Sequence, residues 1–182
     1  SSSTTWINAS KIQISRDANT GKITITNNNT NAIIFSNNYI PSAPVSTEEN
    51  QINEWVGYSE NITIPTTGSY RIKFMGVQGE STAIDNISIM SLTRENKPFN
   101  GLIVPLNNAN FESPTVNNFT YTISGWVSNN WVALVNNNMG YSSLNVSPTP
   151  YGEQFLILEG VNEHIYQDIV LENDNYEFSW FL

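Results

Sequence analysis

The residues that could carry out catalysis are few, because the chain of 182 residues contains one histidine and no cysteine. Without cysteine, disulfides, thiolate metal sites and a cysteine nucleophile are excluded. His164 lies in an expected strand, and the sequence has neither a G-x-S-x-G nor an H-E-x-x-H motif. A catalytic histidine needs a carboxylate to orient it beside a nucleophile. No motif singles out two acidic residues for glycoside hydrolysis. We therefore expect a non-enzymatic protein in which His164 has a structural or surface role.

Aromatic residues in expected loops indicate a second kind of site, one that binds a sugar. Such a site is largely apolar, with a few placed polar groups, and an aromatic ring stacks on the pyranose. Trp131 lies among amides in the run NNWVALVNNN, and Tyr141 and Tyr151 lie in segments that we expect to be loops. These three are the candidate ligand-binding residues. The alternative, also for Trp131, is that the ring packs inside the fold.

Charge is distributed unevenly along the chain, whose net charge is −9. All seven basic residues lie at or before Lys97. The tract 98–182 contains no basic residue and these acidic ones: Glu112, Glu153, Glu159, Glu163, Asp168, Glu172, Asp174 and Glu177. The excess of negative charge repels a phosphate backbone, so we expect no nucleic-acid binding. It predicts that a protein partner docking on this tract is rich in Lys or Arg, unless the tract is only a solvated surface.

Alternating apolar and polar residues predict an all-β, antiparallel fold. In residues 69–74 (SYRIKF), for example, Tyr70, Ile72 and Phe74 would point one way and the two basic residues the other. No segment keeps the spacing of an amphipathic helix, and no apolar run is long enough to span a membrane, so we expect no membrane insertion. We expect strands near residues 11–15, 22–26, 32–36, 54–65, 69–77, 83–92, 150–158, 165–171 and 176–182.

Four strings in the second half of the chain carry a family resemblance. They are N-x-x-F-E-x-P (residues 108–114), I-x-G-W (123–126), P-x-G-x-Q-F-L-x-L (150–158) and I-x-Q-x-I-x-L (165–171). In this order they resemble the opening half of a galactose-binding-like jelly-roll module. Such modules occur among carbohydrate-binding modules, plant cell-wall proteins with paired modules and repeat proteins of giant DNA viruses. The resemblance implies a jelly-roll β-sandwich with Trp55, Trp126 and Trp180 in its core.

The first half of the chain resembles the closing half of the same module. Residues 54–65 give a W-x-x-Y strand, residues 69–74 a Y-x-I-x-F strand and residues 83–88 a final AIDNIS strand. The halves therefore stand in inverted order: residues 1–92, a linker at 93–100, and residues 101–182. Three arrangements are open, namely one circularly permuted domain, halves exchanged between chains, and a fragment of a tandem array. The chain has no starting Met, and we expect it to be part of a longer protein.

The resemblance also implies a structural calcium site where the first and last strands of such a module meet. Its ligands in related jelly rolls are the Glu of the N-x-x-F-E string and an Asp of the last strand, and the matching positions are Glu112 and Asp85. These carboxylates, with carbonyls such as those near Asn107, would suit an ion that takes six to eight oxygen ligands. The alternative is that Asp85 caps a strand end and Glu112 lies in solvent.

The function that the resemblance implies is non-catalytic. We expect a module for adhesion or assembly in an extracellular, cell-surface or virion protein, with protein partners and with glycans as a further ligand class. The asparagine-rich sequence and the strings TAIDNIS and PTPYGEQ favour a capsid-associated component. The alternative is a carbohydrate-binding module that belongs to a glycan-active enzyme.

Overall fold

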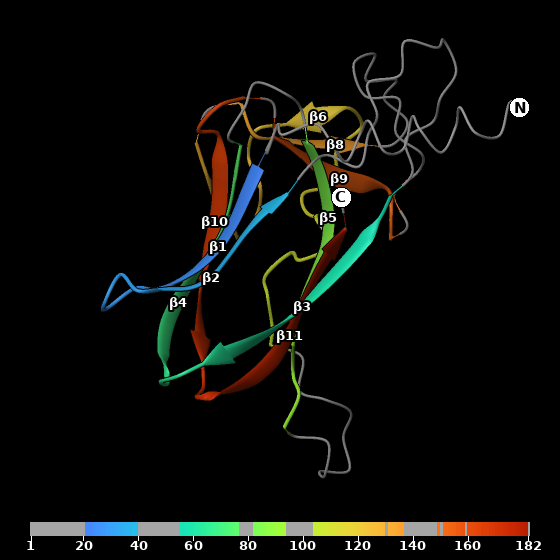
Figure 1. Cartoon of the computed structure of the whole chain (residues 1–182). Helices are drawn as coiled ribbons and strands as arrows, with labels where there is room; N and C mark the ends of the chain where they lie inside the picture. Colours follow the sequence, from blue (N-terminus) through green and yellow to red (C-terminus); the bar gives the residue numbers. More distant parts are fainter. Residues whose placement is uncertain are drawn as a thin grey trace, which may run out of the picture.

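The chain is all-β in the part that the structure describes. The computed structural model describes residues 21–39, 55–76, 82–93, 104–129, 131–136, 149, 151–158 and 160–181. Within these ranges the regular elements are eleven β-strands, which form two antiparallel sheets arranged as two layers (Figure 1). The predicted antiparallel all-β class is confirmed. No helix long and apolar enough to cross a lipid bilayer is found among the described residues.

The first sheet has five strands in the order β2-β1-β4-β10-β7. Their bounds are Gly21–Asn27 (β1), Ile33–Tyr39 (β2), Gly68–Gly76 (β4), Val127–Ser128 (β7) and His164–Leu171 (β10). The second sheet has six strands in the order β3-β11-β5-β9-β8-β6. Their bounds are Gly57–Ile64 (β3), Thr82–Ser91 (β5), Phe119–Thr120 (β6), Ala133–Asn136 (β8), Gln154–Leu158 (β9) and Asp174–Phe181 (β11).

The core lies between the sheets and follows from the alternation along each strand. In β4, Tyr70, Ile72 and Phe74 are fully buried, whereas Arg71 and Lys73 on the other face are partly exposed. Trp126 and Trp180 belong to the same core, as expected, and Trp55 packs against a smaller cluster that includes Phe155. Burial of apolar surface, at roughly 25 cal/mol per Å², stabilises this arrangement in a chain without disulfides.

Strands from the two halves of the sequence are neighbours in both sheets. In the first sheet β4 pairs with β1 on one side and with β10 on the other. In the second sheet β11 lies between β3 and β5, and β5 pairs with β9. Residues of 21–91 and of 104–181 therefore contribute to one shared core. The expected strand at 11–15 lies outside the described residues, as does most of the expected linker at 93–100.

Two buried glutamines hold the long segment 104–126 against the sheets. Gln167 of β10 donates to the carbonyls of Asn107 (3.0 Å) and Gly125 (2.7 Å) and accepts from the backbone N–H of Asn107 (2.9 Å). From the other sheet, Gln154 of β9 donates to the carbonyls of Phe111 and Pro114 and accepts from the N–H of Val116. The segment that carries Glu112 is thus fixed to both sheets.

Candidate functional site

Asp85 is fully buried at an irregularity in the second sheet. Between the pairs Ser179–Ser88 and Phe181–Asp85, β5 has one residue more than β11. Asn86, inside this bulge, has a φ of 45°, a conformation that Asn tolerates better than most residues. An extra residue re-aims the side chains around it. Ile84 and Asp85, neighbours in a strand, are consequently both buried.

Glu112 lies near Asp85, because the segment that carries it is held against the start of β9. Its Oε1 accepts the backbone N–H groups of Glu153 and Gln154, both at 2.9 Å. Gly152 has a φ of 89°, and a Cβ added there would lie 2.2 Å from the same oxygen. Glycine is therefore required at position 152 on two grounds, its backbone conformation and the space that Glu112 occupies.

The carboxyl of Asp85 is buried away from water, which disfavours its charged form. The pKa of Asp85 is raised from 3.8 to about 7, mainly by burial and to a smaller extent by the charge of Glu112. Hydrogen bonds from the Thr149 hydroxyl and from the N–H of Asn86 (2.7 Å) oppose this effect. The Thr149 hydroxyl also accepts the N–H of Tyr151 at 3.0 Å. Two carboxylates that repel each other in a buried place favour a proton or a cation between them.

The side chains of Asp85, Glu112 and Thr149 offer oxygens, the ligands that a hard cation such as Ca²⁺ takes. Both carboxylates also accept backbone N–H groups. In the described ranges, no group of three or more His, Asp or Glu side chains is placed to hold a metal ion. The residues present therefore fit such an ion only as part of its coordination. They supply two carboxylates and the hydroxyl of Thr149, and backbone carbonyls would have to supply the rest.

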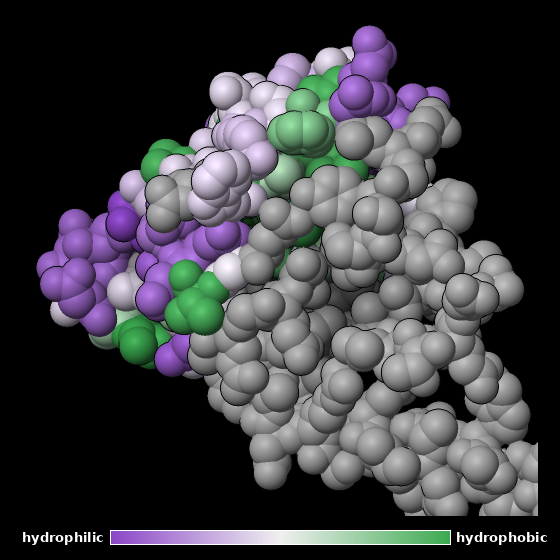
Figure 2. Space-filling view, turned by 90° about the horizontal axis from the view of Figure 1, so that it is seen from above, coloured by the Kyte–Doolittle hydropathy of each residue, from purple (hydrophilic) through white to green (hydrophobic). Residues whose placement is uncertain are grey.

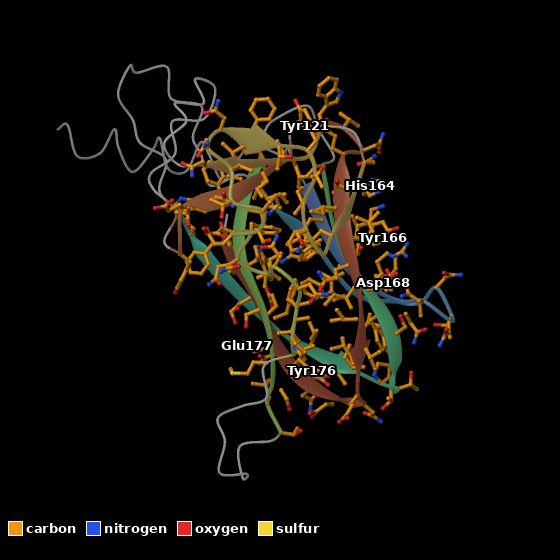
Figure 3. The ribbon with its side chains drawn as sticks, turned by 180° about the vertical axis from the view of Figure 1, so that it is seen from behind. Tyr121, His164, Tyr166, Asp168, Tyr176 and Glu177 are labelled. Carbon is orange, nitrogen blue, oxygen red and sulfur yellow. The ribbon has the colours of Figure 1, made fainter. Side chains whose placement is uncertain are left out.

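A second site is an exposed cluster of three aromatic rings. Trp131 is 61% exposed, and Phe119 and Tyr121 are each 44% exposed. The ring of Tyr121 contacts those of both partners in edge-on geometry, with centroids 5.4 Å from Phe119 and 5.6 Å from Trp131. Tyr121 lies at one end of the molecule, and Tyr176 and Glu177 lie towards the other (Figure 3). We call Phe119, Tyr121 and Trp131 the ring cluster.

The other two candidate ligand-binding residues, Tyr151 and Tyr141, are not among the residues of the ring cluster. Tyr151 is 49% exposed, and its ring packs on Phe181. Trp131 and Tyr151 lie at opposite ends of the β8–β9 pair, because Ala133 pairs with Ile157 and Asn136 pairs with Gln154. Tyr151 instead adjoins the Asp85 site through Thr149. Tyr141 lies outside the described residues.

His164 is the first residue of β10. Its Nδ1 lies 3.1 Å from the carbonyl oxygen of Asn162, and its ring stacks on Tyr166 with centroids 6.2 Å apart. In the described part of the chain, no hydrogen bond or ion pair joins its ring to a carboxylate. Figure 3 shows His164, Tyr166 and Asp168 in a row along β10. These contacts suit the structural or surface role expected for His164.

The sequence reasoning missed several residues of both sites. Phe119 and Tyr121 carry a signal, since F-T-Y alternates, but the strand β6 has only two residues and gives no clear period. Thr149 and Gly152 had no signal of their own beyond the P-x-G-x-Q string.

The space-filling view from above shows separate apolar patches among polar residues on the described surface (Figure 2). No single broad apolar face stands out among the described residues in that view.

Comparisons of the chain with models of known families, with characterised proteins and with solved structures gave no match. The class that the fold defines is thus an antiparallel, two-layer β protein.

Proposed function

We propose that this chain is a non-catalytic binding module of the galactose-binding-like jelly-roll class, and that its ligands are glycans. It would serve adhesion or assembly in an extracellular, cell-surface or virion protein, and the asparagine-rich sequence supports the virion version. The observation that carries the proposal is the ring cluster. Three rings in mutual contact stay largely exposed, although burying them would be favourable. An exposed aromatic group of this kind is suited to stack on a sugar ring.

The geometry of the ring cluster supports stacking on a sugar. Because the rings meet edge to face, they support one another and leave ring surface open to a ligand. Asn118, next to Phe119, is exposed and offers an amide for sugar hydroxyls. Asn129 has a different task, since its amide donates to the Asn162 carbonyl and its oxygen accepts the His164 N–H.

A glycan array with the purified chain tests this function. We expect sugar-competed signals that Trp131→Ala weakens by roughly two- to twelvefold, the range that an aromatic contact of about 0.5–1.5 kcal/mol gives. Tyr151→Ala is the matched control, because Tyr151 has similar exposure and lies away from the ring cluster. If no glycan on the array gives a signal and a protein is recovered as the binding partner, the function is protein assembly and not glycan binding. Equal losses in the two variants would remove the ring cluster as the site.

We further propose that the two halves form one permuted module. The support is that strands of residues 21–91 and of residues 104–181 neighbour each other in both sheets. Neither set of strands closes a core without the other, because each sheet would lose central strands.

A structural calcium ion between Asp85 and Glu112 is part of the proposal. Asp85 and Glu112 would hold it with Thr149 beside them, and the ion would neutralise the two carboxylates. Its role would be structural: it would tie the bulge of β5 to the Glu112 segment and to the start of β9. The support is the pair of carboxylates, Asp85 buried and Glu112 partly buried, whose charges repel each other and which lie beside the Thr149 hydroxyl.

A further inference from the structure

The three basic residues in the described part of the chain lie together on the outer face of the first sheet. Arg71 and Lys73 stand two residues apart on β4 with their side chains away from the core. Thr24 of β1 pairs with Lys73, and Lys22 pairs with Met75, so Lys22 is the diagonal neighbour of Lys73. Neighbouring strands are about 4.8 Å apart, and alternate residues of one strand are about 6.6 Å apart. The outer face of β1, β4 and β10 is therefore locally positive on a chain with a net charge of −9.

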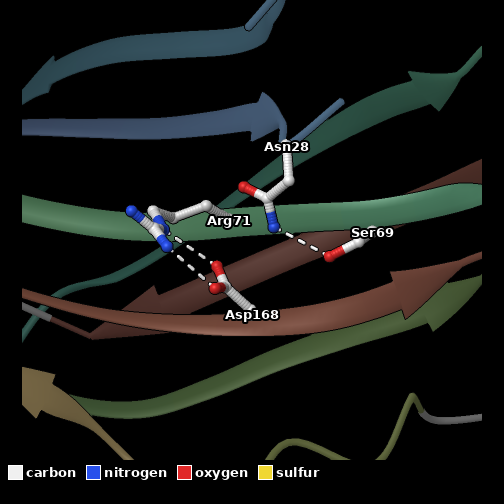
Figure 4. Close-up of polar contacts among 4 residues, drawn as sticks. All are labelled: Asn28, Ser69, Arg71 and Asp168. Atoms are coloured by element: carbon white, nitrogen blue, oxygen red, sulfur yellow. Dashed lines mark hydrogen bonds and ion pairs between the residues drawn. The ribbon is translucent and has the colours of Figure 1, made fainter. Parts of the chain in front are cut away.

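The neighbouring strand β10 fixes Arg71 and leaves the lysines without a partner. Both Asp168 carboxylate oxygens accept from Arg71, each at 2.8 Å (Figure 4). The guanidinium carbon of Arg71 lies 3.8 Å from the centroid of the Tyr166 ring. Asp168 thus neutralises Arg71. In the described part of the chain, no salt bridge joins Lys22 or Lys73 to a carboxylate. These two ammonium groups are the charges open to a ligand.

The surroundings of Lys73 favour an anion beside it. Partial burial lowers the pKa of Lys73, and the positive charge of Arg71 lowers it further. The attraction of a negative group at this place would offset both the repulsion and the cost of the lost hydration. Tyr166 lies opposite Lys73 on β10, and Thr24 and Thr26 place hydroxyls on the same face. The face thus combines open cations with neutral hydrogen-bonding groups.

The backbone around this face is unsuited to a peptide. An extended peptide gains most from unpaired N–H and C=O groups at a sheet edge. Here β1 lies between β2 and β4, β4 between β1 and β10, and β10 between β4 and β7. These strands offer side chains only, which suits a ligand that carries its own hydroxyls and acid groups.

We propose that the outer face of β1, β4 and β10 binds an acidic polysaccharide, with Lys22 and Lys73 contacting its carboxylate or sulfate groups. This rests on the proposed glycan-binding function and names the glycan class. Arg71 is held by Asp168 and Tyr166 and orders the face rather than contacting the acid group directly. The hydroxyls of Thr24 and Thr26 are placed to contact sugar hydroxyls.

Binding of the purified chain to polygalacturonate and to heparin tests the proposal and separates carboxylate from sulfate recognition. We expect salt-sensitive binding to at least one polymer, weakened roughly two- to thirtyfold in the double variant Lys22→Gln/Lys73→Gln, since each exposed ion pair contributes about 0.2–1 kcal/mol. Ser59→Asp/Asn61→Asp, at exposed positions of β3 in the other sheet, changes the net charge equally and should leave binding unchanged. Lys22→Arg/Lys73→Arg keeps the charge and should restore binding, which excludes a folding defect as the cause of the loss.

Other outcomes overturn the proposal. Equal binding of fully methyl-esterified polygalacturonate would show that the acid groups are not recognised. Equally tight binding of poly-glutamate would indicate an acidic protein partner instead. If Trp131→Ala weakens binding to neutral glycans while neither anionic polymer binds, the proposed function stands and this inference fails. If no glycan of any kind binds, both fail.

Discussion

At the scale of single residues, the buried carboxyl of Asp85 makes stability depend on pH. Its raised pKa means that the folded chain holds a proton there more tightly than the unfolded chain does. Without a metal, the stabilisation from that proton is complete below the ordinary pKa of 3.8. It is lost as the pH rises through about 7. We therefore expect the free energy of unfolding of the chelated protein to fall between about pH 4 and 8.

The variant Asp85→Asn tests this expectation, because an amide does not titrate in that range. Thermal unfolding in chelator should give a flatter dependence of Tm on pH for the variant than for the parent chain. Calcium should raise the Tm of the parent chain at pH 8, because a ligand of the native state stabilises it by mass action. It should not raise that of Asp85→Asn to the same extent. Identical curves in chelator and in millimolar Ca²⁺ would remove the calcium site.

At residue level, a prediction from sequence was possible where a string marks a position in the fold, and the role of the named residues as metal ligands stays a prediction. The F-E and AIDN strings named Glu112 and Asp85, and the structure brings the two side chains close enough to interact. Prediction from sequence could not reveal that Thr149 would face Asp85, since a lone Thr in a loop carries no periodic signal. Nor could Trp131 alone predict its partners in the ring cluster, because the contact with Tyr121 depends on how β6 and β8 pair.

At the scale of elements, the long strands were predictable and the short ones were not. The strands β4, β10 and β11 alternate buried and exposed residues over eight or nine positions, which is enough for a period of two. β6 and β7 have two residues each. These two strands form because neighbouring strands offer them hydrogen bonds. No local sequence pattern indicates that such a neighbour will be present. The bulge in β5 likewise depends on its pairing with β11.

The attachment of segment 104–126 to β10 gives a prediction at this scale. Gln167→Ala removes a side chain that makes three hydrogen bonds to buried or partly buried backbone groups. Each unpaired group costs about 1–3 kcal/mol unless water reaches it. We expect a loss of roughly 2–4 kcal/mol in the free energy of unfolding, measured by chemical denaturation.

The control for this change is Val170→Ala on the same strand, where the side chain is 71% exposed. Its effect should stay within about 0.5 kcal/mol. Equal destabilisation by the two substitutions would show that the glutamine does not anchor the segment.

At the scale of the whole molecule, strands from both halves complete the two sheets within one chain. A purified, dilute chain should therefore be a monomer by light scattering, at all concentrations in the micromolar range. Halves exchanged between chains would instead give a mass that rises with concentration. The sequence predicts two half-modules in inverted order, and that order stays a prediction, whereas the pairing of the two halves depends on distant contacts such as those of β4 with β10, which no local string encodes.

The position of β11 has a consequence for how the protein is made. This strand is formed by residues 174–181 and lies inside its sheet, between the edge strand β3 and β5. During synthesis β3 and β5 leave the ribosome about a hundred residues before the strand that separates them. Until then their facing edges have no partner, and unpaired edges on a nascent chain invite pairing with other chains. Contacts between residues so distant in sequence also form slowly. Demand for chaperones should therefore be greatest in the interval before the last strand emerges.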